Sequence, residues 1–102
     1  MNEPRLTALA RSDLKRIWKD LARKGDEAVA NRWTAEILLR CFDHARFPET
    51  GQLREEFAPG LRSFPVAPYV AFFRPEEDSI QVIRILDGRR NLDRLMKRKG
   101  AG

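Results

Sequence analysis

Two amphipathic helical patterns separated by only two residues constrain the fold more than any other feature of this sequence. The first begins at Ser12, which can cap a helix, and continues with Asp13, whose charge the helix dipole favours in the first turn. Gly25 ends this pattern, and Asp26 can cap the helix that follows. Apolar residues at three- and four-residue spacing mark the buried face of the first helix: Leu14, Ile17, Trp18 and Leu21. With so short a connection, we expect the helices to fold back as an antiparallel hairpin.

The second helix is expected to end at Phe47, because Pro48 cannot continue it. Its apolar stripe consists of Val29, Trp33, Ile37 and Cys41, widened by Ala30, Leu38, Phe42 and Ala45. We predict that the stripes of the two helices press together. Trp18 and Trp33 are expected to serve packing rather than base stacking.

The residues after Pro48 favour strands. We predict strands over Leu61–Val66, Tyr69–Arg74 and Ile80–Leu86, with a turn at Ala67-Pro68. Pro65 indicates that the first of these lies at a sheet edge. A short edge strand over Arg5–Leu9, a short basic helix over Arg90–Lys97 and a frayed tail over residues 98–102 complete the prediction. The expected fold is α+β, with the hairpin on one face of a small antiparallel sheet, in a single domain of 102 residues.

The last predicted strand is apolar on both faces. Regular alternation places Ile80, Val82 and Leu86 on one face with Arg84, and Ile83 and Ile85 on the other with Gln81. One helical hairpin covers only one face of a sheet. Either the C-terminal helix folds over the second face or a partner peptide lies across it, and the sequence favours neither.

Positive charge is concentrated at the C-terminal end. The chain has 20 basic and 15 acidic residues, and the stretch from Arg84 to Gly102, with seven basic and two acidic residues, accounts for the whole net charge of +5. An anionic partner is expected there. Five arginines come from the predicted strands and their ends: Arg62, Arg74, Arg84, Arg89 and Arg90. The arginine fork suits phosphates and carboxylates, as in a nucleic-acid or acidic-peptide surface; the alternative is a composition bias with no site.

Several classes of protein and site are disfavoured. The sequence has no apolar run near the roughly 20 residues of a membrane span and no signal peptide, so we expect a cytoplasmic protein. For Cys41 and His44, the single cysteine and histidine, we predict a buried thiol and a solvent-facing imidazole rather than a metal site. No Ser-His-Asp set or glycine-rich phosphate loop is present, and the acidic runs Glu55-Glu56 and Glu76–Asp78 are typical of solvated loops. No cofactor is predicted.

Five segments carry a family pattern by their order and spacing: Ala10–Trp18, Pro48 with Thr50-Gly51, Gly60–Val66, Tyr69–Arg74 and Ile80–Arg90. Together they resemble the ParE/RelE toxin superfamily over nearly the whole chain, and the ParE branch is the closer likeness. The resemblance implies the toxin of a bacterial type II toxin-antitoxin system, of the kind associated with plasmid stabilisation and growth inhibition. It also implies a small ParD-like antitoxin with an acidic segment that wraps the toxin in a hetero-oligomer.

Members of the superfamily differ in their target. ParE-like members inhibit DNA gyrase and block replication, whereas RelE-like members cut mRNA in the ribosome with basic side chains and often a tyrosine. This chain has no Tyr or His after Asp87, and Pro65 stands on the strand where a ribonuclease would carry a basic residue. The resemblance therefore favours inhibition of gyrase by binding, without catalytic residues. Asp87 stands where many relatives carry His, and direct nucleic-acid binding remains open.

The resemblance and the charge pattern assign residues to these roles. The expected antitoxin contacts are Arg62, Tyr69, Arg74, Ile83 and Arg84. The expected target contacts are Arg89, Arg90, Leu92, Arg94 and Leu95. In a ribonuclease, catalysis would fall to Arg62, Arg84 and Arg89. A third alternative is a toxin-fold interaction module without activity.

Overall fold

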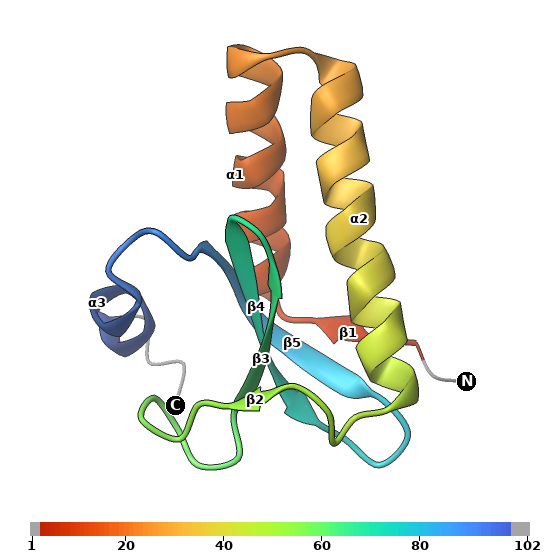
Figure 1. The fold of residues 1–102 in the computed structure, drawn as a ribbon, viewed down its shortest axis with the longest axis vertical. Coiled ribbons are helices and arrows are strands. Elements are labelled where there is room, and N and C mark those ends of the chain that lie inside the picture. The colour runs from red at the N-terminus through yellow and green to blue at the C-terminus, as the bar shows by residue number, and fades with distance from the viewer. Residues whose placement is uncertain (1–2, 99–102) are drawn as a thin grey trace.

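A helical hairpin packs on one face of a five-stranded sheet, and a short helix covers the other face (Figure 1). The computed structural model describes residues 3–98. The helices are α1 (Ala8–Lys24), α2 (Glu27–Arg46) and α3 (Leu92–Arg98). The strands are β1 (Arg5–Leu6), β2 (Gln52–Leu53), β3 (Arg62–Val66), β4 (Tyr69–Pro75) and β5 (Ile80–Asp87). The predicted α+β architecture is confirmed, and the predicted tail beyond Arg98 lies outside the described residues.

The sheet is mixed rather than wholly antiparallel. Its strand order is β1-β5-β4-β3-β2, with β1 parallel to β5 and every other pair antiparallel. β1 is shorter than the predicted strand over Arg5–Leu9 because Thr7 caps α1, and its hydroxyl oxygen accepts a hydrogen bond from the Ala10 amide. The predicted helix start at Ser12 is therefore wrong, since Ser12 lies on the exposed side of α1.

β2 is too short for its sequence pattern to have revealed it. It pairs only with Arg62 and Ser63, so the outer side of β3 is unpaired at Pro65, although β3 is not the terminal strand of the sheet. Gly51 precedes β2 with a φ of 98°, and a Cβ there would lie 2.9 Å from the Ser63 carbonyl oxygen. This close approach requires glycine.

The hairpin turns where the sequence predicts. Asp26 caps α2 by accepting a hydrogen bond from the Val29 amide at 2.9 Å, and Phe47 is the C-cap. The main core lies between the hairpin and the sheet and contains Ala10, Ile17, Ile37, Cys41, Ala45, Phe64, Val66, Ala71, Phe73, Ile80, Val82 and Ile85. Trp33 packs against this core, whereas Trp18 is half-buried and donates from Nε1 to Asn31 Oδ1 at 2.8 Å.

A β-bulge changes which residues of β5 face the hairpin. Phe72 pairs with Arg84 but Phe73 pairs with Val82, so Ile83 is an extra residue in β5. Ile85 consequently joins the hairpin-side core, and Leu86 joins Ile83 on the opposite face. The regular alternation expected for this strand holds through Ile83 and is wrong at Ile85 and Leu86.

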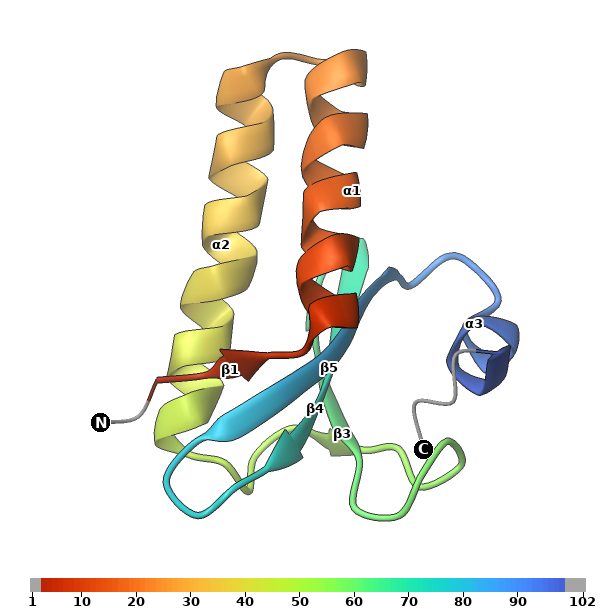
Figure 2. The same ribbon diagram turned by 180° about the vertical axis from the view of Figure 1, so that it is seen from behind.

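The second face of the sheet is covered by this chain itself. A smaller core there contains Ala58, Leu61, Phe72, Ile83, Leu86 and Met96, with Leu92 and Leu95 of α3 packed against it. Figure 2 shows α3 on the far side of the sheet from α2. Of the two possibilities open from the sequence, the C-terminal helix supplies the cover. None of the described helices has the length and apolar character needed to cross a membrane.

Candidate functional site

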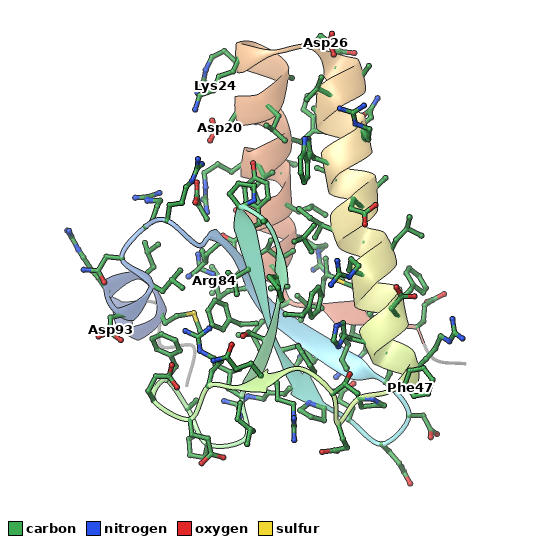
Figure 3. The ribbon with its side chains drawn as sticks, in the orientation of Figure 1. Asp20, Lys24, Asp26, Phe47, Arg84 and Asp93 are labelled. Atoms are coloured by element: carbon green, nitrogen blue, oxygen red, sulfur yellow. The ribbon has the colours of Figure 1, made fainter. Side chains whose placement is uncertain are left out.

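A cleft of about 500 Å³ opens between α1, the adjoining ends of β4 and β5, and the segment leading into α3. Its basic lining residues are Arg16, Lys24, Arg84, Arg89 and Arg90, and its acidic ones are Asp20 and Asp87. Aromatic and apolar side chains form the rest of the wall, among them Ile17, Leu21, Trp33, Tyr69 and Leu95. The cleft therefore combines excess positive charge with apolar surface. Figure 3 shows Asp20, Lys24 and Arg84 on the same side of the molecule as α3.

The cleft borders a buried ion pair that joins α1 to β5. Arg84 Nε and Nη2 donate to the two carboxylate oxygens of Asp13 at 2.8 and 2.9 Å, and the Ile85 amide donates to Asp13 Oδ2 at 3.0 Å. Asp13 is 1% exposed and Arg84 is 3% exposed. Arg16, largely exposed, donates a further bond to Asp13 Oδ1 at 2.7 Å. One carboxylate thus binds two arginines and the backbone of β5 beyond its short pairing with β1.

Sequence reasoning placed Asp13 in a first helical turn and missed this role. Because α1 begins at Ala8, Asp13 lies inside the helix on the same face as Ala10 and Ile17, which are also buried. That spacing was the available signal: a carboxylate on the apolar stripe of a helix requires a buried cation or donor.

Asp87 and Arg89 form a second pair at the cleft rim. Asp87 Oδ1 accepts hydrogen bonds from the Arg89 amide at 2.9 Å and from Arg89 Nε at 3.0 Å, and Oδ2 accepts from Nη2 at 2.7 Å. The hydrogen bond from the Arg89 side chain lowers the pKa of Asp87 to about 2. Asp87 is therefore charged at neutral pH and orients the Arg89 guanidinium.

Tyr69 also lines the cleft, where it pairs with Asp87 across β4 and β5. Its ring meets Trp33 edge-on at 6.4 Å. Burial, and to a lesser degree the charge of Asp87, raise the pKa of the Tyr69 phenol. The phenol therefore stays protonated at neutral pH.

The five residues expected to contact an antitoxin lie in three places. Tyr69 and Arg84 line the cleft, whereas Ile83 is buried in the core beneath α3. Arg62 and Arg74 line a separate, shallower depression of about 490 Å³ beside β2. There Arg62 Nη1 donates to the Gly51 carbonyl at 3.2 Å and Arg74 Nη1 donates to the Pro59 carbonyl at 3.0 Å.

The residues expected to contact a target divide into two kinds. Arg89, Arg90 and Arg94 are exposed. Leu92 and Leu95 are partly buried against the second core, so they anchor α3. The three arginines considered for a ribonuclease do not share one site: Arg62 lies in the shallow depression, while Arg84 and Arg89 line the cleft.

Cys41 and His44 face different surroundings. The Cys41 thiol is fully buried, and this burial raises its pKa to about 12. His44 is half-buried rather than solvent-facing, and its ring stacks on Phe64 at 4.2 Å. The described residues contain no group of three or more potential metal ligands.

The outer side of the hairpin carries an apolar groove of about 410 Å³. It is lined by Leu14, Trp18, Thr34 and Leu38, with Arg11 and Lys15 beside them. Leu39 and Phe42, two exposed apolar residues of α2, are 60% and 45% accessible. Apolar surface of this kind on a small domain is typical of a docking site for another protein.

Comparison with known proteins gives concordant matches. The family described as ParE toxin of the type II toxin-antitoxin system, parDE, matches residues 5–92. Toxin ParE3 of Caulobacter vibrioides is 34% identical over 80 residues, which cover 78% of this chain and 80% of that protein. The structure of the chromosomal ParDE TA system from P. aeruginosa contains a chain with the same fold, with a TM-score of 0.70 at 22% identity, covering 85% of this chain and 98% of that one.

Proposed function

Because this chain belongs to the ParE toxin family of type II toxin-antitoxin systems, we propose that it inhibits DNA gyrase by binding and that a cognate antitoxin neutralises it. We favour binding over RNA cleavage because the cleft arginines Arg84 and Arg89 are already ion-paired within the chain. Arg84 is held by Asp13, and Arg89 is held by Asp87. The donors that these pairs occupy, Nε and Nη2 of each arginine, could bind a phosphate only by breaking a charged hydrogen bond.

A general base is also lacking among the residues that line the cleft. Cleavage at a ribose requires a group that takes the proton of the 2′-hydroxyl. The Tyr69 phenol is protonated, Asp87 is a weak base with a pKa of about 2, and Asp20 is paired with Arg23 at 2.9 Å. These features support inhibition by contact rather than by catalysis.

The surface we assign to gyrase is the exposed basic part of the C-terminal segment. Arg90 and Arg94 are exposed there, and α3 is fixed to the sheet by Leu92, Leu95 and Met96. Exposed arginines on an anchored helix or just before it can form charged contacts without first ordering the helix backbone. The apolar hairpin groove, bordered by Arg11 and Lys15, suits an amphipathic, acidic helix of the antitoxin.

The test is pulse-labelling of DNA and protein synthesis in bacteria minutes after the chain is induced without an antitoxin. We expect DNA synthesis to fall first, accompanied by gyrase-linked DNA breaks. An Arg90→Ala/Arg94→Ala variant should lose this effect, and Arg32→Ala, which removes an exposed arginine of α2, should keep it. An earlier fall in protein synthesis would replace this proposal with the ribonuclease function, and no effect on either would favour an inactive interaction module.

A further inference from the structure

The first helix carries a concentration of positive charge that the net charge of the chain hides. The residues before Arg84 sum to zero charge, yet α1 alone has six basic and two acidic residues, a net charge of +4. One of these acids, Asp13, is buried and bound to Arg84. Asp20 is therefore the one acidic side chain that α1 presents to solvent.

Four of the basic residues form a regular stripe, which we call the α1 basic stripe. Its members are four positions apart, and all are exposed: Arg11, Lys15, Lys19 and Arg23. Residues four apart in an α-helix follow one another along the same face, so the stripe is about 18 Å long. It lies opposite the buried side of the helix, which consists of Ala10, Asp13 and Ile17. In Figures 1 and 2, β4 lies on one side of α1 and no other element covers the opposite side.

The charges of the stripe are not neutralised within the chain. Like charges four residues apart repel each other and destabilise a helix. Within residues 3–98, Lys15 and Lys19 form no ion pair. Arg23 has an exposed pair with Asp20 at 2.9 Å, and Arg11 donates to a backbone carbonyl of β1 at 2.7 Å. A polyanion laid along the stripe would remove the repulsion between its members.

The dimensions of the stripe suit the phosphate backbone of duplex DNA. Successive phosphates of one strand advance about 3.4 Å along the duplex axis, so the stripe spans about five of them. The side chains beside it are small, so the helix can approach a backbone closely: Ala8, Ser12 and Ala22. The stripe itself lacks the large apolar anchor that a protein partner uses. Because α1 is packed into the main core, its charges are held in place before binding.

We propose that the α1 basic stripe binds the phosphate backbone of duplex DNA without regard to sequence. Lysine and arginine contacts to phosphates position a protein on DNA but do not read the bases. The proposal stands on the charges of α1 and does not require that the chain acts on gyrase. Arg11 and Lys15 also border the apolar hairpin groove, so an occupant of that groove would cover part of the stripe. The DNA contact is therefore a property of the chain free of antitoxin.

The test uses the purified full chain without antitoxin and a fluorescently labelled duplex of mixed sequence, with binding followed by anisotropy at several salt concentrations. Four phosphate contacts predict that the logarithm of the association constant falls with the logarithm of the salt concentration with a slope of about −3 to −4. Lys15→Gln/Lys19→Gln should reduce the steepness of this slope by about two, because two contacts are lost. At about 50 mM salt, the same variant should bind at least about tenfold more weakly.

Matched variants and other polyanions locate and define the contact. Lys15→Arg/Lys19→Arg keeps both charges and should bind as the parent does. Arg5→Gln/Arg32→Gln removes the same charge from exposed positions of β1 and α2 outside the stripe, and it should keep the slope of the parent.

Three results would each overturn the proposal. They are an unchanged salt slope in Lys15→Gln/Lys19→Gln, an equal loss of affinity in Arg5→Gln/Arg32→Gln, and binding of the parent to polyglutamate or to mixed phosphatidylcholine and phosphatidylserine vesicles that is as tight as binding to the duplex. Since no gyrase, antitoxin or cell growth enters this assay, its outcome is separate from that of the proposed function.

Discussion

Asp13 shows how one side chain can connect distant parts of a small protein. Its carboxylate binds Arg84, 71 positions away in the sequence, and caps the Ile85 amide at the free edge of β5. The pair is shielded from solvent, so its two charges attract each other strongly. Each charge also needs the other to offset the free-energy cost of its burial. Removal of Asp13 leaves Arg84 as an uncompensated buried charge, whereas removal of Arg84 leaves Asp13 bonded to Arg16 and the Ile85 amide.

We expect Asp13→Asn to lower the free energy of unfolding by about 3 kcal/mol, because Arg84 keeps its charge while its counter-ion is lost. Urea denaturation followed by circular dichroism measures this change. Asp20→Asn is the matched control, since within residues 3–98 the ion pair of Asp20 is an exposed one with Arg23 and its loss should cost less than about 1 kcal/mol. Similar destabilisation by both variants would contradict a special role for Asp13.

At the scale of elements, α3 both covers the second face of the sheet and presents basic surface to solvent. Met96 is 1% exposed and packs with Phe72, Ile83 and Leu86, while Arg94 on the same helix is exposed. Stability and the proposed target contact are thus combined in one short helix. Deletion of this helix cannot test one role without affecting the other.

Deletion of residues 89–102 should lower the free energy of unfolding by about 3 kcal/mol, since burial of Met96 alone is worth about 1.5–3 kcal/mol and two leucines are partly buried beside it. The measurement is again a urea midpoint. Arg94→Ala keeps the apolar anchors and should change stability by less than about 0.5 kcal/mol. An unchanged midpoint in the deletion would show that α3 does not stabilise the sheet.

At the scale of the whole molecule, two cores share one sheet. The hairpin-side core contains Cys41, which has no exposed surface, and burial raises the pKa of its thiol to about 12. The thiol is therefore protected both by exclusion of reagent and by the scarcity of thiolate. Its reactivity should follow unfolding of the molecule rather than local motion.

A thiol reagent at slightly alkaline pH should label native Cys41 at least about a thousandfold more slowly than the chain unfolded in guanidinium chloride, given an ordinary domain stability. Mass spectrometry of timed samples gives both rates. In a Cys41→Ala/Ser12→Cys variant, the exposed position on α1 should label rapidly in the native state. Rapid labelling of native Cys41 would instead show that the main core opens locally.

The sequence alone determined the hairpin, the three longer strands and the basic character of the C-terminal end. These features depend on neighbours in the chain: the Gly25-Asp26 connection, apolar spacing in the helices and β-branched residues in β5. Arg89 and Arg90 could be selected as site candidates for the same reason, since they follow directly after a strand and a glycine.

The tertiary structure decided which distant residues meet. The bulge at Ile83 exchanged the faces of Ile85 and Leu86, which regular alternation cannot predict because it depends on pairing with β4. The partnership of Asp13 with Arg84 likewise required α1 to dock beside β5. The cleft forms where these contacts bring α1, β5 and the segment before α3 together. Its net charge is the sum over residues that are far apart in the sequence, so no local pattern could predict it.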